Sequence, residues 1–582
     1  QGQEPVALKA LDSAMRSGGW ALLQNCDLGL NFMSSLEETL KTMWAKSWDD
    51  QDALRASRVF LTAAPNEHFP LGILQMGIKV TNEAPNGIRA GMLRAFSTLV
   101  DQDRIDRVDA PVWRQLLYTL CFLHCTMAER RKFGPLGWSV PYEFSAGDLV
   151  ASVGYLEKAL YASSTTSVAW PALAYIVGEC VYGGKITDGL DRRLMTTYAT
   201  AWLNERVLSA DFRFNETDVV EDNFNYSVCD KQEHADYLRH IQALPEEESA
   251  GVFGLHPNAE LKHRLLAAGH LIDAVASTQP GMGSVATAGS GSVEEATKDR
   301  CNELLGSMPN ADFSMEIVTS IINEKRGGFS EPLNVVLSQE CSLLQRVVDM
   351  ARYDLVQLVQ AVDGEITLTE TLATAMQAVR NGSVPRHWLY TVAGDLRSWM
   401  ATSITSWFET LSSRHHQLSV WLNNGQPASF WLAGLQNKKA FITATLQAVA
   451  RAHRDEEWAL DDVVVYAEVS DIASSDAAKA PPKEGVFVHG LFLEGARWAK
   501  SGLTESEPKQ LFAPMPLVYL TATTVAQKMA ARASTAVYEC PLYTYPRRTG
   551  QHLVTIIDLP AGAASPEHWI LRGVALLCNQ DV

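Results

Sequence analysis

The chain is best understood from one stretch of its sequence, Arg130-Arg131-Lys132-Phe133-Gly134-Pro135-Leu136-Gly137-Trp138-Ser139-Val140-Pro141-Tyr142-Glu143-Phe144. This stretch combines a cluster of three basic side chains with Gly- and Pro-containing turns and several aromatic residues. It holds no spacing typical of metal ligands and no phosphate-binding loop. The stretch therefore does not indicate a catalytic motif.

The size and charge of the chain limit its class. A chain of 582 residues is too long for one hydrophobic core, so we expect two to four domains. Hydrophobic residues make up 47% and charged residues 20%, as in ordinary globular proteins. The formal net charge of -18 argues against nucleic acid or an anionic membrane surface as the main partner. No apolar run reaches the ~18 residues that span a bilayer.

The cysteines and the first residues indicate the cellular setting. The 9 cysteines are scattered, and no Cys-x-x-Cys pair occurs, which favours free thiols in a reducing compartment. No secretory signal opens the chain. Because the sequence begins Gln1-Gly2-Gln3-Glu4-Pro5, without Met, we expect it to belong to a longer polypeptide.

The first hundred residues contain a strand, a helix and a second strand. The apolar run Trp20–Cys26 predicts a strand buried on both faces. Ser34 and Glu37 have the spacing of a capping box, which predicts the start of the following helix. Residues 58–62 predict a second apolar strand. This order indicates a parallel βαβ unit, and we expect its remaining strands to precede Gln1.

Helical periodicity dominates the middle of the chain. It extends from about Val112 to His270, and a small-residue tract at Gly281–Ser292 then predicts a flexible linker. A narrow apolar seam from Leu337 to Val362 predicts a long helix that packs lengthwise on the preceding module or on the following β-rich part. A second helix is predicted over Leu396–Leu411.

After Pro427 the pattern changes to short apolar runs separated by Gly/Pro turns. We predict a small antiparallel β-subdomain, a barrel or a sandwich, from six runs: Val463–Tyr466, Val486–Leu493, Leu517–Leu520, Tyr538–Tyr545, Leu553–Leu559 and Trp569–Leu577. The fold class is therefore multidomain α+β.

A nucleotide-hydrolysing site is not indicated. The phosphate-binding motif Gly-x-x-x-x-Gly-Lys-Ser/Thr is absent, and Gly183-Gly184-Lys185 lacks both its first half and its hydroxyl residue. The strand at residues 20–26 ends in Asn25-Cys26 and a lone Asp27, where a hydrolytic site needs adjacent acidic residues.

Two groups of residues belong to the types that bind metals. Cys121, His124 and Cys125 could share one helix face, as a thiol or metal site would require. Their apolar neighbours favour small core cysteines instead. The adjacent His415 and His416 diverge on a helix, which favours a surface feature over a shared metal.

The aromatic and basic residues allow two interpretations each. An aromatic cage would need exposed, convergent rings, whereas core spacing favours burial of five tryptophans: Trp388, Trp399, Trp407, Trp421 and Trp431. The cluster Arg130-Arg131-Lys132 is either a solvated helix end or a contact to an acidic neighbouring module.

Several motifs in sequence order resemble the C-terminal end of dynein heavy chains. The stretch at residues 130–144 resembles the segment after the last motor module, and residues 485–498, Gly-Val-Phe-Val-His-Gly-Leu-Phe-Leu-Glu-Gly-Ala-Arg-Trp, resemble the C-terminal domain of axonemal members. Further similarity lies in Gly19–Cys26, Phe69–Gln75, Lys79–Glu83, Tyr182–Asp188 and Phe253–Ala259. His usually follows the first of these motifs in the family, where this chain has Asp27. Residues 458–462 and 567–578 resemble outer-arm gamma-type chains.

The resemblance implies a domain order and a role. Residues 1–105 would be the C-terminal part of the sixth AAA+ module, 106–270 its helical lid and 271–295 a linker. Residues 296–455 and 456–582 would be the helical and β-rich parts of the dynein C-terminal domain, the latter a barrel-like subdomain. The segment would close the AAA+ ring and regulate a minus-end-directed microtubule motor in the axoneme of cilia and flagella.

The resemblance implies no catalytic, cofactor-binding or metal-binding residue in this segment. ATP and Mg would bind in upstream AAA+ modules of the same heavy chain. Partners would be those modules and the other heavy, intermediate and light chains of the arm. The microtubule would be reached only through the distant stalk, and neither nucleic acid nor a membrane is expected. A free-standing scaffold on a degenerate AAA+ module and a cysteine- or metal-dependent enzyme remain the alternatives.

Overall fold

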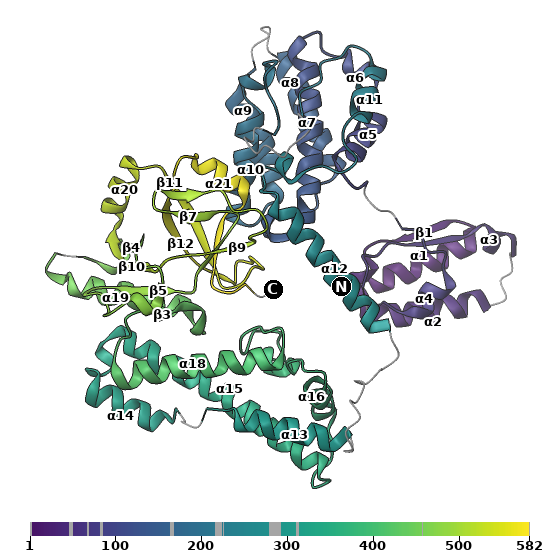
Figure 1. Cartoon of the computed structure of the whole chain (residues 1–582). Helices are drawn as coiled ribbons and strands as arrows, with labels where there is room; N and C mark the ends of the chain where they lie inside the picture. Colours follow the sequence, from purple (N-terminus) through teal and green to yellow (C-terminus); the bar gives the residue numbers. More distant parts are fainter. Residues whose placement is uncertain are drawn as a thin grey trace. The chain divides into compact units, whose positions relative to one another are not determined.

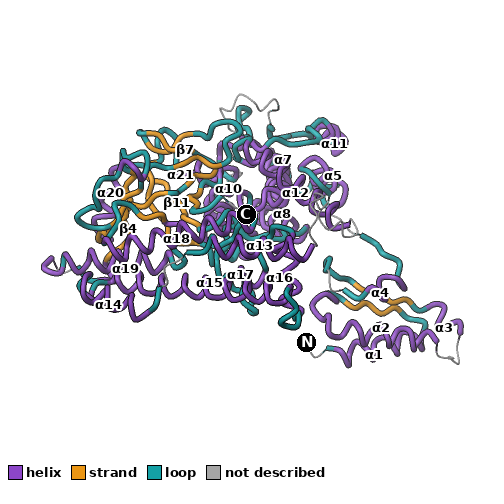
Figure 2. Tube along the Cα trace, turned by 60° about the horizontal axis from the view of Figure 1, so that its bottom comes forward, coloured by secondary structure: helices purple, strands orange, loops and turns teal. Residues whose placement is uncertain are grey.

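The computed structural model divides the chain into two compact units, Gln1–Ala84 and Pro85–Val582 (Figure 1). It describes residues 3–45, 51–66, 69–81, 85–162, 168–215, 224, 226–278, 293–309, 313–456 and 458–580. The predicted linker tract Gly281–Ser292 lies outside these residues. Strands occur in two places, as a pair in the first unit and in the last third of the chain (Figure 2).

The first unit is the predicted parallel βαβ arrangement. Its elements are α1 (Glu4–Ser17), β1 (Trp20–Leu23), α2 (Leu30–Ala45), α3 (Gln51–Ala56), β2 (Arg58–Leu61) and α4 (Leu71–Met76). Strands β1 and β2 pair in parallel, with Trp20 opposite Arg58 and Leu23 opposite Leu61. The βαβ prediction is confirmed.

Two details of that prediction are wrong. Strand β1 is buried on one face only, because α1, α2 and α4 supply a core on the Ala21 side, whereas Trp20 and Leu22 on the other face are 74% and 55% exposed. Helix α2 begins at Leu30 and not at Ser34, since a 3-10 turn at Cys26–Gly29 leads directly into it. Glu37 then pairs with Lys41 on the same helix.

The central helical region (residues 85–278) confirms the predicted helical periodicity. Its elements are α5 (Ile88–Thr98), α6 (Gln102–Ile105), α7 (Pro111–Glu129), α8 (Ala146–Ala162), α9 (Trp170–Tyr175), a π-helical turn (Ile176–Tyr182), α10 (Gly189–Trp202), α11 (His234–Gln242) and α12 (Asn258–Thr278). The apolar side chains of α7 lie in the hydrophobic core of this region.

The C-terminal region (residues 293–580) begins with helices. These are α13 (Val293–Gly306), α14 (Met315–Lys325), α15 (Pro332–Val362), α16 (Glu370–Arg380), α17 (Arg386–Leu389), α18 (Ile404–Asn424) and α19 (Lys438–Ala452), with α20 (Val525–Ser534) and α21 (Pro566–Arg572) later in the sequence. Helix α18 begins at Ile404 because Ser403 and Ser406 form a capping box. The prediction that the helix includes Leu396 and Met400 is therefore wrong.

The long apolar seam is confirmed in α15. Seven of its residues are buried: Leu337, Cys341, Leu344, Val348, Ala351, Leu355 and Leu358. The seam contacts helices of its own region, including α13, α14, α18 and α19. The helix thus packs mainly on other helices of its own region, and α19 in turn contacts β10.

The predicted β-rich subdomain is present, but its described strands form open sheets and not a barrel. They are β3 (Phe430–Trp431), β4 (Val463–Val469), β5 (Val486–His489), β6 (Phe492–Glu494), β7 (Arg497–Ala499), β8 (Gly502–Thr504), β9 (Phe512–Pro514), β10 (Val518–Thr524), β11 (Val537–Tyr543), β12 (Leu553–Pro560) and β13 (Ala575–Leu577). Their orders are β3-β5-β10-β4, β12-β11-β13-β6-β9 and β7-β8. Two pairs, β3–β5 and β11–β13, are parallel.

Local reversals of the backbone divide two of the predicted strand runs. Gly490 has a φ of +75° and divides the run Val486–Leu493, so β5 and β6 join different sheets. The run Trp569–Leu577 is also not one strand, because Gly573, with a φ of +65°, ends α21 before β13 begins.

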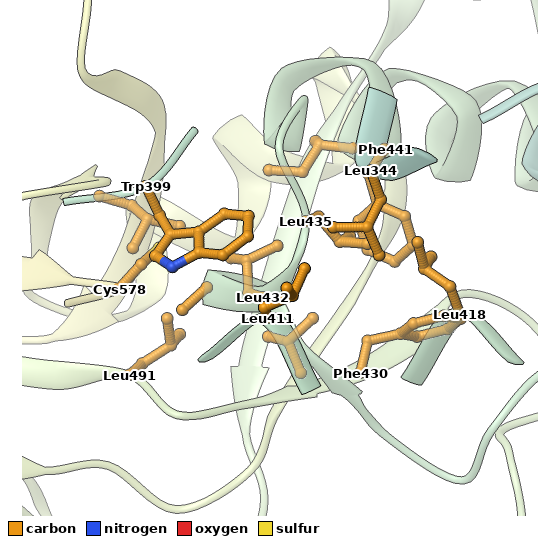
Figure 3. Close-up of a cluster of buried hydrophobic side chains, with 14 of the residues drawn as sticks. Leu344, Trp399, Leu411, Leu418, Phe430, Leu432, Leu435, Phe441, Leu491 and Cys578 are labelled. Carbon is orange, nitrogen blue, oxygen red and sulfur yellow. The ribbon is translucent and has the colours of Figure 1, made fainter. Parts of the chain in front are cut away.

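One hydrophobic core joins the helices and both larger sheets of the C-terminal region. Figure 3 shows side chains from α15, α18, α19 and the strand segments meeting in it, among them Leu344, Leu418, Phe441 and Leu491. Within the described residues, no helix is long and apolar enough to cross a membrane.

Candidate functional site: the junction of the central and C-terminal regions

Arg130, the first residue of the stretch 130–144, lies fully buried between the central helical region and the C-terminal region. Helix α7 ends at Glu129, and a 3-10 turn over Arg130–Leu136 bends the backbone back past the Arg130 side chain. The guanidinium donates to the carbonyl oxygens of Gly137 (2.9 Å), Phe253 and Leu571 (2.8 Å). The last of these acceptors lies 441 residues further along the sequence.

The charge of Arg130 is balanced by dipoles. Its Nη1 also donates to the Tyr198 hydroxyl at 2.6 Å, and that hydroxyl donates to the Phe253 carbonyl. Burial lowers the pKa of Arg130, and the neighbouring Tyr198 opposes this shift. Five donors in a fixed fork suit such a site, which a lysine could not satisfy in the same way.

Helix α21 carries the reciprocal contact. Arg572, also buried, donates to the Gly254 carbonyl at 3.2 Å and pairs with Glu505 at 3.2 Å. The backbones approach closely here. A Cβ at Gly254 would lie 2.9 Å from the Leu571 side chain, and one at Gly573 would lie 2.8 Å from the Leu136 carbonyl oxygen. Both glycines have positive φ, so the close contact and the backbone conformation each require them.

A buried ion-pair triad crosses the same junction. Lys262 on α12 pairs with Glu494 on β6 at 2.5 Å, and Glu494 pairs with Arg548 at 2.6 Å. Burial alone would raise the pKa of Glu494, but the two cations hold it below its ordinary value. Arg548 also donates to the Gly573 carbonyl. A buried charge that is paired on both sides is costly to break.

Polar contacts at the edge of the junction fix its register. The Asn258 side chain donates to the carbonyl oxygens of Glu507 and Gln510, each at 2.9 Å, and accepts from the Lys509 backbone N–H. Arg193 on α10 pairs with Glu539 at 3.6 Å. The junction therefore has the means to hold the two regions as one body, and it offers no reactive group.

The basic cluster fits neither of its two interpretations as a whole. Arg131 lies at the surface beside Glu143, as a solvated helix end would. Lys132 pairs at 2.7 Å with Glu248, a largely buried carboxylate of the same region. Arg130 is a buried hydrogen-bonding centre, which the sequence did not indicate.

The cysteine candidates lie in the core of the central helical region, as the apolar neighbours indicated. Burial raises the pKa of the Cys121 thiol to about 12 and that of Cys125 well above its ordinary value. His124 lies 3.0 Å from the Tyr182 hydroxyl, and burial lowers its pKa to about 4. The thiols are thus protonated and the imidazole neutral near pH 7, which does not suit a thiolate nucleophile.

The other candidates have structural surroundings. Lys185, in a 3-10 turn with Gly183 and Gly184, pairs with Asp148 at 2.7 Å. Asp27 accepts a hydrogen bond from the Ala64 backbone N–H. No group of three or more His, Cys, Asp or Glu side chains within the described ranges is placed to hold a metal.

The histidine pair and the tryptophans divide between surface and core. His416 is exposed, and the His415 ring lies 4.6 Å from that of Phe313. Four of the tryptophans are buried, Trp388, Trp399, Trp407 and Trp421, while Trp431 is partly buried. Their predicted role in the core is confirmed.

Comparison with known proteins decides the family. Three family models match consecutive parts of the sequence: the region D6 P-loop domain of the dynein heavy chain at residues 1–81, its AAA lid domain at 113–259 and its C-terminal domain at 266–578. The last covers more than half of the residues. The chain belongs to the dynein heavy chain family.

The similar proteins are axonemal members of that family. The chain is 37% identical over 583 residues to Dynein axonemal heavy chain 8 of Homo sapiens and to Dynein axonemal heavy chain 5 of Mus musculus. It is 36% identical over 589 residues to the Dynein gamma chain, flagellar outer arm, of Chlamydomonas reinhardtii. These matches cover 100% of this protein but only 12–13% of each relative. It thus corresponds to the C-terminal part of an axonemal dynein heavy chain.

The dynein models also define the junction. Arg130, Gly254 and Asn258 lie in the part matched by the lid model, whereas Glu494, Leu571 and Arg572 lie in the part matched by the C-terminal domain model. The motifs that carried the resemblance, around residues 130–137, 253–258 and 567–573, contact one another across it. Because these motifs are far apart in the sequence, their contact could not be predicted from it. The boundaries predicted at 105, 270, 295 and 455 stay predictions.

Proposed function

We propose that this chain is the C-terminal, non-catalytic part of an axonemal dynein heavy chain, which closes the AAA+ ring and regulates an ATP-driven, minus-end-directed microtubule motor. The similarity to the gamma chain of a flagellar outer arm favours an outer-arm heavy chain. ATP and Mg would bind in upstream modules, and the partners would be those modules and the other chains of the arm. The site of action would be the axoneme of a cilium or flagellum.

The observation that carries this proposal is the buried junction between lid and C-terminal domain. Arg130, Arg572 and the triad Lys262–Glu494–Arg548 hold the two domains together with desolvated charges. A domain fixed in this way to one module moves with that module. It can therefore change the energy of ring states through the contacts that it makes in each state.

The first unit supports a role inside a larger ring. Its parallel sheet has two described strands, and one face exposes Trp20, Leu22 and Phe60. Two parallel strands seldom form a stable sheet alone. We infer that preceding segments of the heavy chain complete this sheet and cover its exposed face.

The test uses the complete heavy chain. We expect removal of the residues after Gly291 to leave basal ATP turnover within a few-fold but to change gliding speed, run length or stall force. Lys262→Met, which loosens the junction without deleting the domain, should change the same motor properties more weakly. Arg264→Met is the matched control, because Arg264 is an exposed residue on the same helix. Complete loss of ATP turnover in a folded truncated motor would contradict the proposal.

A further inference from the structure

The C-terminal region contains a positively lined cavity away from the junction. The cavity has a volume of about 620 Å³ and lies between α15, the segment 391–399, α18, the start of α19 and the end of β11. Four cationic residues line it, Arg346, Arg397, Arg414 and Lys438, and no carboxylate occurs among its described lining residues. This is unusual in a protein with a formal net charge of -18.

Two of the cations are buried without an anionic partner. Arg414 and Lys438 are 3% and 5% exposed, and neither forms an ion pair with any described residue. The Arg414 Nη atoms donate to the carbonyl oxygens of Gly434 (2.8 Å) and Ala433 (2.7 Å), and its Nε has no hydrogen-bond partner among the described residues. Lys438 donates to the Leu435 carbonyl at 2.7 Å.

The one buried carboxylate that the structure describes nearby is already engaged. Glu340 accepts from the backbone N–H groups of Gln436 (2.7 Å) and Asn437 (2.6 Å), which precede α19. The Nε2 of Gln436, which lines the cavity, has no partner in the described part of the protein. Burial lowers the pKa of Lys438 to about 8 and that of Arg414 to about 10, and the Glu340 carboxylate opposes both shifts. The described lining of the cavity thus holds four cations and no carboxylate, and Glu340 is the one described carboxylate that acts on two of them.

The cavity offers several hydrogen-bond donors to an anion. Each Nη atom of Arg414 donates one hydrogen bond to a carbonyl oxygen, so the Nε–H and the second hydrogen on each Nη are not used by these two bonds. Lys438 acts as a point charge, a common phosphate ligand in proteins. The Tyr545 hydroxyl accepts from the Met400 N–H at 3.3 Å and keeps its own proton to donate.

The remaining lining residues and the volume of the cavity indicate a ligand larger than a phosphate ion. Trp399 and Leu435 are apolar members of the lining, and both are labelled in the buried cluster of Figure 3. The Arg414 guanidinium lies 4.5 Å from the centre of the Trp399 ring, which holds it in place. A free phosphate ion would fill only part of the volume.

We propose that this cavity binds a small phosphorylated molecule, with its phosphate group held by Lys438 and Arg414 and its carbon portion against Trp399 and Leu435. Such a ligand would supply the missing negative charge and stabilise the helices and strands that surround the cavity. The C-terminal domain would then be sensitive to a soluble metabolite.

The test is a titration of the whole 582-residue protein at pH 7 and constant ionic strength, followed by calorimetry and thermal unfolding. The probes are inorganic phosphate, pyrophosphate and glucose 6-phosphate, with glucose and sodium chloride as controls. We expect saturable binding of the phosphorylated probes at one site, with a rise in Tm that follows occupancy. Glucose 6-phosphate should bind more tightly than phosphate, because its carbon portion adds contacts with Trp399 and Leu435. Equal affinities would overturn the assignment of a phosphorylated organic molecule as the ligand.

Variants distinguish the site from general salt effects. Lys438→Gln should weaken binding by about tenfold or more, because it removes a charge-assisted hydrogen bond. Lys439→Gln makes the same change at the next, exposed position and should bind as the wild type does. Arg346→Gln, at the exposed rim, tests the cavity without disturbing the core and should weaken binding a few-fold. Absence of saturable binding at ten-millimolar ligand, or equal binding by all variants, would overturn the proposal.

Discussion

The junction and the cavity both bury positive charge in an acidic protein, but they compensate it differently. At the junction, Lys262 and Arg548 share Glu494, and Arg130 is surrounded by carbonyl and hydroxyl oxygens. In the cavity, Arg414 and Lys438 donate to backbone carbonyls and form no ion pair with a described residue, although the Glu340 carboxylate raises the pKa of both. Desolvated charge that is compensated within the protein holds domains together, whereas charge that is not compensated favours an added anion.

The largest expected effect comes from removing the shared carboxylate at the junction. Glu494→Gln leaves Lys262 and Arg548 buried without an anion, so it should lower the free energy of unfolding by about 3–5 kcal/mol. Urea unfolding followed by tryptophan fluorescence measures this. Glu507→Gln, which removes an exposed carboxylate paired with Arg497, is the control and should cost at most about 1 kcal/mol. If Glu494→Gln and Glu507→Gln lowered the free energy of unfolding equally, the buried pairs of Glu494 would contribute no more than the exposed pair of Glu507.

The same lysine substitution should have opposite signs at the two places. Lys262→Met leaves Glu494 with one cation and should destabilise the protein by about 1–3 kcal/mol. Lys438→Met removes an uncompensated buried charge and keeps the apolar stem, so it should stabilise the ligand-free protein by about 1–2 kcal/mol. Matched urea titrations in phosphate-free buffer decide this. If Lys262→Met and Lys438→Met both destabilise the protein, then the charge of Lys438 is compensated in the folded protein, as that of Lys262 is.

The pH dependence sharpens the comparison at Lys438. Its pKa is about 8 in the folded protein, below the ordinary value of 10.5, because of burial, with Cys578, Arg414 and Glu340 as charged or titratable neighbours. Below pH 8 the folded protein carries the full cost of the charged lysine. Between about pH 8 and 10.5 the folded lysine loses its proton while the unfolded one keeps it, so this cost disappears as pH rises.

The measurable quantity is the stability difference between Lys438→Gln and the wild type. It should be constant below about pH 8 and shrink as pH rises toward about 10. Working with the difference cancels the contributions of buried cysteines that do not interact with Lys438, such as Cys540, whose raised pKa acts in the opposite direction. A stability difference that does not change with pH would show that folding does not lower the pKa of Lys438.

The smallest expected effect is on magnesium-dependent nucleotide binding. The sequence lacks the phosphate-binding motif and the paired acidic residues that hold magnesium, so ATP with Mg should not bind at micromolar affinity. Calorimetric titration of the purified protein measures this. Stoichiometric, magnesium-dependent binding would contradict the prediction. Magnesium-independent binding that Lys438→Gln abolishes would instead belong to the cavity.

Local patterns in the sequence predicted the helices and the strand pair of the first unit. The four-and-three spacing from Leu337 to Leu358 fixes one apolar stripe, so α15 follows from helical geometry whatever its partner is. The apolar strands β1 and β2, separated by a helix, likewise require a parallel connection. The aromatic and glycine-containing motifs, taken in order, also sufficed to indicate the dynein heavy chain family.

Only the tertiary structure decided which of several similar residues are buried, exposed or paired. Arg130, Arg131 and Lys132 are consecutive and basic, yet they are respectively buried, exposed and paired, because the acceptors of Arg130 come from segments up to 441 residues away. Likewise, Lys438 and Lys439 differ only in which side of α19 they occupy. Helical and strand periodicity depends on neighbours within a few residues, so it can be predicted from the sequence. Charge compensation and sheet order depend on distant segments that meet only after folding, so they could be determined only from the folded structure.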